Sequence, residues 1–307
     1  SGGLAAFVQT RRSGDEETQE VRFISVEGFV TGAVYGPVTT AGPDAEPEIV
    51  ELAWSWDASS LAILRADGAI EALVGLDDPF FDSSVPLPLI PASRNQISAV
   101  TWGPTGDGIA YLMAGADGRH HLMVAPRDVQ PIDVLATDGG RVRTVADFEW
   151  LPGRGRVAFV EDSRVPGSRA PASIFTIVPN GTALELLVSA SRFAPAATIG
   201  KMNASPDARE LAFFLYAPDA QGRPEFQTLW VLHIDSGELR EIPVEPGYVV
   251  TDTWFMSGGL LWRGVDLGST SIDAGTTYTG VEPFILAFTD AEGATSILFQ
   301  STLVEDE

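Results

Sequence analysis

Charged and amide side chains recur just ahead of a tryptophan position that repeats along the sequence. They are Glu51, Asp147, Glu149, Lys201, Asn203 and Asp252, and Lys201 is the single lysine of the chain. Carboxylates from separate strands, together with an ammonium group, suit a small polar ligand or a cation at the mouth of a central channel. The alternative is that these side chains are simply solvated at the end of such a channel.

An acidic stretch at 75–84, GLDDPFFDSS, combines oxygen ligands with aromatic side chains. Asp77, Asp78 and Asp82 offer carboxylates for a calcium ion, although the stretch lacks the regular aspartate spacing of a calcium-binding loop. The other interpretation is a solvated loop. Phe80 and Phe81 either contact a partner protein or pack the loop onto the rest of the chain.

The residue types exclude several kinds of catalysis. There is no cysteine, which rules out disulfides, thiolate nucleophiles and thiolate metal sites. His120 and His121 are adjacent in an expected strand and point to opposite faces, so they and the distant His233 do not form a zinc triad. Neither a Gly-x-Ser-x-Gly elbow nor a phosphate-binding glycine pattern occurs. We therefore assign no catalytic residue, expect no enzyme activity, and expect no cofactor unless calcium binds.

The charge and the hydropathy pattern limit the partners. The net charge of −23 argues against nucleic acid, whose phosphates require clustered lysine and arginine. No segment approaches the roughly 18 apolar residues that cross a bilayer. The chain starts at Ser1 without a signal-peptide pattern. We expect a part processed from a longer protein, with any membrane anchor outside residues 1–307.

A repeat organises the whole sequence. Its copies start about 50 residues apart, a period that suits a four-stranded propeller blade. The aromatic anchors are Trp54, Trp102, Trp150 and Trp254, with Ala204 in the fourth copy. The aligned segments are LAWSWDASSLAIL at 52–64, VTWGPTGDGIAYL at 100–112, FEWLPGRGRVAFV at 148–160, MNASPDARELAFF at 202–214 and DTWFMSGGLLWRG at 252–264.

The repeat predicts an all-β fold, a six-bladed β-propeller of four-stranded antiparallel blades that fills residues 1–307 as a single domain. A truncated copy opens the chain, with Leu4 to Phe7 aligned on Ile109 to Leu112. Its inner strand is expected either ahead of Ser1 or from the C-terminal segment around 294–304.

The turn after the tryptophan has a structural explanation. Aspartate can accept hydrogen bonds from backbone N–H groups two residues on, and glycine adopts positive φ. Asp57, Asp107 and Asp207 are therefore predicted to be turn residues rather than catalytic acids. The tryptophan is expected to bury a large face between adjacent blades while its indole N–H finds an acceptor.

The segments SWDASSLAIL, GPTGDGIAYL and SPDARELAFF resemble the repeats of TolB-like, WD-repeat-like β-propellers, the last most closely through Ser205, Pro206 and Asp207. The third copy departs from the pattern with Gly153 and Arg154, and the fifth with the stretch 256–258. The resemblance implies a fold rather than an activity. TolB itself is a periplasmic protein-interaction module, and related propellers precede the hydrolase domain of prolyl-oligopeptidase-like peptidases.

These observations favour a non-catalytic propeller that binds another protein, a membrane-associated or envelope protein. The expected location is periplasmic or extracellular, with an anchor outside this chain if one exists. Two alternatives remain open at this point. One is a propeller that gates or regulates a hydrolase or peptidase, and the other is a propeller that binds a small ligand or cation through its channel carboxylates.

Overall fold

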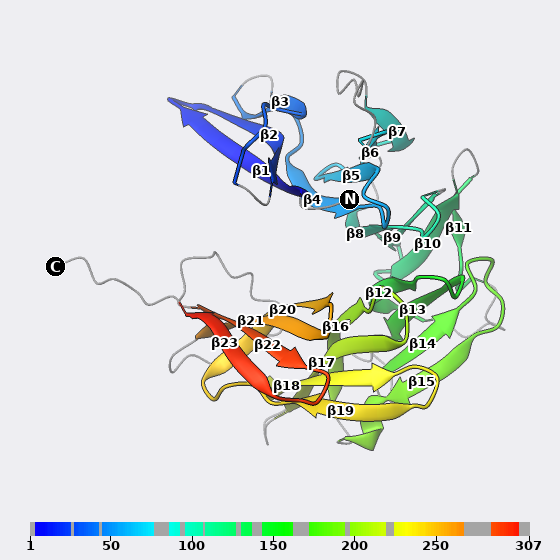
Figure 1. The fold of residues 1–307 in the computed structure, drawn as a ribbon. Coiled ribbons are helices and arrows are strands. Elements are labelled where there is room, and N and C mark those ends of the chain that lie inside the picture. The colour runs from blue at the N-terminus through cyan, green and yellow to red at the C-terminus, as the bar shows by residue number, and fades with distance from the viewer. Residues whose placement is uncertain are drawn as a thin grey trace. The chain divides into compact units, whose positions relative to one another are not determined.

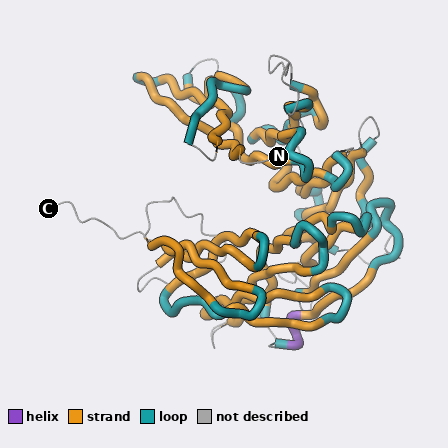
Figure 2. Tube along the Cα trace, viewed as in Figure 1, coloured by secondary structure: helices purple, strands orange, loops and turns teal. Residues whose placement is uncertain are grey.

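The computed structural model describes residues 4–25, 28–42, 45–76, 86–92, 96–106, 108–126, 130–136, 143–161, 172–193, 197–218, 224–266 and 284–300. The chain forms two compact units, residues 1–140 and residues 141–307, and each unit is described by itself. Figure 2 shows that the described chain consists almost wholly of strands and turns, with a short 3-10 helix at Ala190–Arg192.

The described part of the first unit contains three antiparallel sheets (Figure 1). The first sheet has the order β1-β2-β3, with β1 (Leu4–Ser13), β2 (Glu16–Ser25) and β3 (Tyr35–Ala41). The second contains β4 (Ile49–Trp54), β5 (Ser60–Arg65), β6 (Ile70–Val74) and β7 (Leu87–Ile90). The third contains β8 (Ile97–Trp102), β9 (Gly108–Ala114), β10 (His120–Pro126) and β11 (Ile132–Asp133).

The described part of the second unit contains three further antiparallel sheets. The first of these contains β12 (Val145–Leu151), β13 (Arg156–Glu161), β14 (Ser173–Ile177) and β15 (Glu185–Ser189). The next contains β16 (Thr198–Ala204), β17 (Glu210–Pro218), β18 (Pro224–His233) and β19 (Glu238–Ile242). The last contains β20 (Tyr248–Met256), β21 (Gly259–Asp266), β22 (Phe284–Asp290) and β23 (Thr295–Gln300).

Six consecutive sheets, each built of strands that pair with their sequence neighbours, confirm the predicted six-bladed β-propeller. Five sheets have four strands, and the repeated tryptophan position lies at or near the end of the first strand of each. The first sheet has three strands among the described residues, which agrees with a first copy that lacks its inner strand. The assignment of residues 1–307 to a single domain stays a prediction.

The described part of the C-terminal segment belongs to the last sheet and not to the first. β23 pairs antiparallel with β22 from Thr295 opposite Thr289 to Gln300 opposite Ile285. Residues 295–300 therefore form the outermost strand of the last sheet. The expectation that the segment 294–304 supplies the missing inner strand is wrong for residues 295–300, because they belong to the last sheet and do not pair with β1.

The backbone directions in the first sheet fix which residues of β1 face β2. The N–H of Val34 donates to the carbonyl of Val21 at 2.9 Å, so Val21 directs its backbone groups toward β3. Val21 lies opposite Val8 in an unbroken antiparallel register. Successive residues of a strand direct their backbone N–H and C=O groups to opposite neighbouring strands. The backbone groups of Val8 therefore point away from β2, and those of the odd-numbered residues of β1 point toward it.

This direction shifts the expected alignment of the first copy by one residue. In β9, Gly108 accepts a hydrogen bond from Gly103 at 2.8 Å on the side of β8, so Ile109 faces β10. The residue of β1 equivalent to Ile109 must face β2, as Ala5 does and Leu4 does not. The segment AAFV at 5–8 then aligns with VAFV at 157–160. The predicted match of Leu4 to Ile109 is wrong, because apolar residue types alone do not show to which neighbouring strand the backbone groups of a residue point.

Adjacent sheets of a unit bury apolar side chains between them. In the first unit, one core cluster joins residues of β5 and β6 to residues of β8, β9 and β10, and Trp102 within it is 1% exposed. The Nε1 of Trp102 donates to the carbonyl of Ala53, on the neighbouring β4, at 3.0 Å. This contact confirms the predicted role of the tryptophan between two blades.

The last sheet uses a different tryptophan. Trp254, at the repeat position, is 41% exposed, so it buries less surface than the repeat predicts. Trp262 on β21 is fully buried instead, and its Nε1 donates to the Oγ1 of Thr289 at 3.1 Å. The second strand of this sheet therefore supplies a buried indole, as the first strand does through Trp102 and Trp150 in the third and fourth sheets, whereas Trp54 is half-buried.

Candidate functional site

The candidate site lies on the inner strands of the three sheets in the second unit. β12 contacts β16, and β16 contacts β20. Asp147 and Glu149 are two residues apart on β12 and therefore share one face of the strand. Lys201 and Asn203 share one face of β16 in the same way.

Asp147 joins two neighbouring sheets through its carboxylate. Its Oδ2 accepts a hydrogen bond from the backbone N–H of Met202 on β16 at 2.5 Å. β16 has an irregularity between Ile199 and Met202, so the ladder to β17 is interrupted there. The carboxylate of Asp147 satisfies a backbone donor at this interruption.

Lys201 and Asn203 link β16 to β20. The Nζ of Lys201 forms an ion pair with the Oδ1 of Asp252 at 2.7 Å, and the Nη1 of Arg263 lies 4.0 Å from the other oxygen of Asp252. The Nδ2 of Asn203 donates to the carbonyl of Thr253 at 2.9 Å. The structure thus brings together five of the six predicted residues. The sixth, Glu51, lies on β4 of the other unit.

The two carboxyl groups on β12 are half-buried and titrate abnormally. Burial raises the pKa of Asp147 to about 6, against the opposing hydrogen bond from Met202. Burial and the neighbouring charge of Asp147 raise the pKa of Glu149 to about 8. At neutral pH, Glu149 is therefore mainly a neutral carboxylic acid that can both donate and accept a hydrogen bond.

This arrangement can bind a polar ligand. It presents a carboxylic acid, a carboxylate, an amide and an ammonium group on three neighbouring strands, which is a set of groups for a small polar ligand. No group of three or more histidine, aspartate or glutamate residues that could hold a metal ion occurs in the described ranges. Asp77, Asp78, Asp82, Phe80 and Phe81 lie outside the described residues, so the calcium site and the aromatic contact stay predictions.

The aspartates of the repeat turns have the predicted structural role. In the first turn, the Oδ1 of Asp57 accepts hydrogen bonds from the Oγ of Ser55 at 2.7 Å and the N–H of Ser59 at 3.0 Å. The backbone bond from Ser59 and the hydroxyl bonds hold the pKa of Asp57 below its usual range. Asp207 makes the same bonds to Ser205 and Arg209, at 2.8 and 3.1 Å. Asp107 lies outside the described residues.

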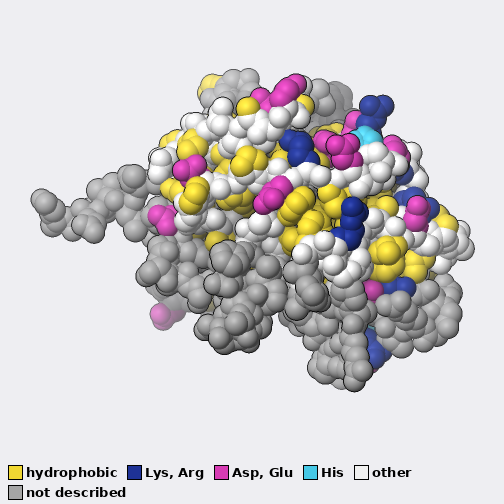
Figure 3. Space-filling view, turned by 90° about the horizontal axis from the view of Figure 1, so that it is seen from below, with side chains coloured by type: hydrophobic (Ala, Val, Ile, Leu, Met, Phe, Trp, Pro, Cys, Tyr) yellow, Lys and Arg dark blue, Asp and Glu magenta, His cyan; other side chains and the backbone are white. Residues whose placement is uncertain are grey.

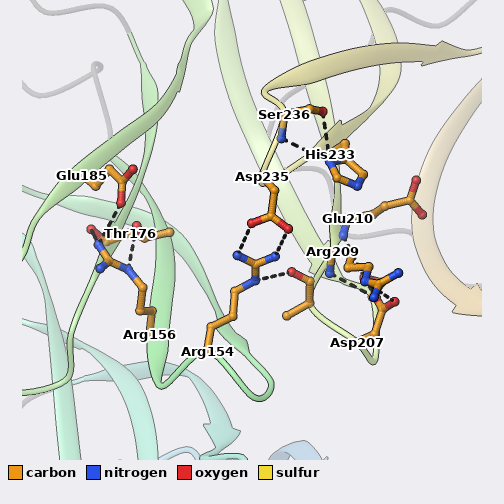
Figure 4. Close-up of polar contacts among 12 residues, drawn as sticks. Arg154, Arg156, Thr176, Glu185, Asp207, Arg209, Glu210, His233, Asp235 and Ser236 are labelled. Atoms are coloured by element: carbon orange, nitrogen blue, oxygen red, sulfur yellow. Dashed lines mark hydrogen bonds and ion pairs between the residues drawn. The ribbon is translucent and has the colours of Figure 1, made fainter.

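Sequence reasoning missed the role of Arg154. In the third copy it stands in the turn that normally contains an aspartate, and its guanidinium reaches the next sheet (Figure 4). Its Nη1 and Nη2 bind the two oxygens of Asp235 at 2.7 and 2.8 Å, and its Nε donates to the carbonyl of Ala208 at 2.7 Å. The only signal in the sequence was the departure from the turn pattern.

The ion pair between Arg154 and Asp235 is exposed enough to respond to salt. We expect Asp235→Asn to lower the melting temperature in dilute buffer and to have little effect at about 1 M NaCl, where charges are screened within a few ångströms. Glu185→Gln, which removes a partner of Arg156 within a single sheet, serves as the comparison. A deficit of the Asp235 variant that persists in high salt would contradict a screened ion pair.

The histidines follow the prediction for adjacent strand residues. His120 is exposed and His121 is half-buried. His121 is held by two carboxylates, through Nδ1 to Asp133 at 2.8 Å and through Nε2 to Asp117 at 3.4 Å. Burial opposes protonation of His121, but these two hydrogen bonds outweigh it and raise the pKa. His233 bonds the Oγ of Ser236 in its own turn at 3.0 Å (Figure 4).

Comparisons with known proteins support the fold and do not identify an activity. No protein-family model matches the sequence, and no curated protein matches it by sequence. A TolB structure from Agrobacterium tumefaciens is similar over 88% of this chain and 84% of its own, with a TM-score of 0.58 and 14% identity. An oligogalacturonate lyase from Vibrio parahaemolyticus is similar over 99% and 86%, with a TM-score of 0.60 and 8% identity.

A puromycin-hydrolyzing peptidase from Mycobacterium tuberculosis is also similar, with a TM-score of 0.61 and 13% identity. The match covers 97% of this chain but 45% of the peptidase, so the chain spans less than half of that enzyme. The fold is therefore shared by proteins with different activities. The described residues contain no helix long and apolar enough to cross a bilayer. With its six consecutive sheets, the chain has the β-propeller fold of TolB.

Proposed function

We propose that this chain is a non-catalytic β-propeller that binds another protein. The observation that carries the proposal is the exposed outermost strand of the last sheet. All six residues of β23 are exposed, and Ile297, Leu298 and Phe299 are 48%, 60% and 54% exposed. Adjacent large apolar side chains at a surface typically mark a protein contact.

The charge of the chain suggests what kind of protein binds. The sequence has 42 acidic and 19 basic residues. In the face drawn in Figure 3, apolar side chains gather between scattered acidic and basic ones. We propose a partner with an apolar patch inside a basic surround, because complementary charge speeds association while the apolar residues supply affinity.

The compartment is part of the same proposal. We place the protein outside the cytoplasm, as part of a bacterial envelope complex with a membrane-associated partner, by analogy with the TolB-like fold. Fractionation of cells with a periplasmic and a cytoplasmic marker tests this location. Co-fractionation with the cytoplasmic marker alone would overturn it.

A charge placed on β23 should abolish partner binding without unfolding the protein. We expect Leu298→Asp to weaken capture of the partner by about tenfold or more, because an aspartate in an apolar contact must lose its hydration. Crosslinking of the tagged protein in an envelope extract of its own organism, followed by quantification of each captured protein, measures the effect.

The matched control is Leu186→Asp, which places the same charge on the outermost strand of another sheet, at a residue 54% exposed. A captured protein counts as the partner only if the Leu298 variant loses it and the Leu186 variant keeps it. If both variants capture the same proteins as the unaltered chain, β23 is not the binding surface.

A second candidate function is binding of a small polar or cationic ligand at the inner strands. The clustering of Asp147, Glu149, Lys201 and Asp252 favours it. A thermal-shift screen of amines, sugars and divalent cations tests it, with Asp147→Asn as the reference variant. A ligand whose stabilisation is unchanged in that variant binds elsewhere.

The third candidate is a propeller module that gates a hydrolase or peptidase. Its support is that this chain spans less than half of the Mycobacterium tuberculosis peptidase. The sequence of the complete gene product tests it. A hydrolase domain with a Gly-x-Ser-x-Gly elbow in that product would support gating, and its absence there would remove this candidate.

A further inference from the structure

The outermost strand of the third sheet is short and is fastened to its neighbour by few backbone bonds. β11 consists of two residues, which pair with Met123 and Val124 of β10 (Figure 1). Just beyond β11, the N–H of Val134 donates to the carbonyl of Leu122 at 3.1 Å. By comparison, β19 pairs with its neighbour over five residues. A strand with so few ladder bonds depends on side-chain contacts to stay in place.

His121 supplies such a contact between β10, β11 and the turn that joins β9 to β10. Its Nδ1 lies 2.8 Å from the Oδ2 of Asp133 on β11, and its Nε2 lies 3.4 Å from the Oδ1 of Asp117 in the turn. The other oxygen of Asp133 accepts a hydrogen bond from the N–H of Leu135 at 3.0 Å. One imidazole ring therefore joins three consecutive segments of the third sheet.

The turn leaves room for the imidazole beside its carboxylate. A Cβ atom at Gly115 would lie 2.5 Å from the Nε2 of His121 and 2.7 Å from the Oδ1 of Asp117, so a side chain there would push the ring away. The Nη1 of Arg119 lies 3.3 Å from the Oδ2 of Asp117, on the carboxylate oxygen that the ring does not contact. The titratable and charged groups of the segments that hold the ring are Asp117 and Arg119 in the turn, His120 on the opposite face of β10, and Asp133 on β11.

The protonation of His121 decides how many of these contacts it can make. A neutral imidazole has one N–H donor and a protonated imidazole has two, so only the protonated ring can donate to Asp117 and Asp133 at once. After loss of the proton, one carboxylate faces a ring nitrogen that carries no hydrogen. Burial opposes protonation, but the hydrogen bonds to Asp133 and Asp117 outweigh it and raise the pKa of His121. Protonation of the ring and closure of β11 therefore favour each other.

We propose that His121 is a pH-sensitive latch for the outermost strand of the third sheet. With the ring protonated, β11 and the residues that follow it stay closed on β10. With the ring neutral, this segment opens more often. Opening uncovers Val134 and Leu135, which are 1% and 8% exposed in the closed structure, and it frees the outer edge of β10.

The latch is separate from the proposed partner contact. β23 belongs to the second unit, whereas β10 and β11 belong to the first. The latch therefore goes beyond the proposed function and does not depend on it.

The direction of the pH response follows from the two states of the segment. A histidine without these contacts has a pKa of about 6.5, and the pKa of His121 in the closed segment is higher. The latch is therefore fully formed below about pH 6.5 and is lost as the pH rises through the raised pKa. Asp117 stays ionised throughout this range, because the hydrogen bond from the N–H of Arg119 and the contact with His121 hold its pKa below the usual value.

Hydrogen exchange of the whole protein between about pH 5.5 and about pH 8.5 tests the latch. The exchange rates of the Val134 and Leu135 amides, divided by the intrinsic rates at each pH, give their protection. We expect this protection to fall by about three- to tenfold across the range, which is the usual loss for one charge-assisted hydrogen bond. Nuclear magnetic resonance signals of the His121 ring report its protonation in the same samples, and the two midpoints should coincide.

Two variants and a control assign the effect to the ring. His121→Gln cannot be protonated, so we expect the same protection at every pH. Asp117→Asn keeps an oxygen for the N–H of Arg119 but removes the negative charge, so the midpoint should move to lower pH. His233→Gln is the control, because His233 bonds within a turn of another sheet, and this protein should show the same fall as the unaltered one.

Three results would overturn the latch. Constant protection of Val134 and Leu135 in the unaltered protein would mean that β11 is held independently of His121. An equal fall in the His121→Gln protein would mean that another group controls the segment. If His121→Gln instead lowers the protection of the whole first unit, the Asp117→Asn protein decides, and a midpoint that does not move overturns the latch.

Discussion

Trp102→Ala is expected to lower the free energy of unfolding by about 3–5 kcal/mol, which is the usual loss for a fully buried aromatic residue. The side chain is 1% exposed and belongs to the cluster that joins the second and third sheets. Its removal leaves a cavity between these sheets and also removes the donor to the Ala53 carbonyl. Urea denaturation followed by circular dichroism measures the change.

Two variants separate the contributions of Trp102. Trp102→Phe keeps most of the apolar contact and loses the hydrogen bond, so its loss should be smaller. Trp56→Ala removes an indole that is 38% exposed, and the expected loss is about 1 kcal/mol or less. If Trp102→Ala is no more destabilising than Trp56→Ala, the second and third sheets are not held together as described.

Glu149→Gln is expected to stabilise the protein in alkaline solution. The pKa of Glu149 is raised to about 8 in the folded protein, whereas glutamate in an unfolded chain has a pKa of about 4.3. Between these values the folded protein binds more protons than the unfolded chain, so stability falls as the pH rises. The glutamine variant has no proton to lose there and should keep up to about 4 kcal/mol that the unaltered protein loses between about pH 5 and pH 9.

Melting temperatures across this pH range measure the effect, and Glu292→Gln in an exposed turn is the control. The variant should match the unaltered protein near pH 5 and exceed it near pH 9. Some decline should remain between about pH 4 and pH 6, because Asp147 titrates with a pKa of about 6. Parallel curves for the unaltered protein and the Glu149 variant would show that this carboxyl group titrates as in water.

The fold was predictable because its signals are local. Alternating apolar residues define a strand within six or seven positions, and the Ser-x-Asp turn between strands depends on five neighbouring residues. The alignment of the first copy was wrong by one residue for the same reason. Leu4 and Ala5 are both apolar, and only the hydrogen bond from Val34 to Val21, carried along the register of β1 and β2, shows which of them directs its backbone groups to β2.

The candidate site was predictable only in part. The position ahead of the tryptophan placed Asp147, Glu149 and Lys201 on inner strands, which the structure bears out. The partner of each side chain was not predictable, since it lies about 50 residues away on the next sheet. The same holds for Arg154, whose partner Asp235 belongs to a turn with no special pattern.

The serine and aspartate turn has a consequence for how the protein folds. The Oγ of Ser55 donates to Asp57 and accepts from the N–H of Ser60 at 2.9 Å, and Ser205 makes the same bond to Glu210. Each turn is thus closed by neighbours within six residues and needs no other sheet. We expect the hairpins to close within microseconds, while docking of one sheet on the next sets the overall rate. A nascent chain could then build one blade after another as it leaves the ribosome.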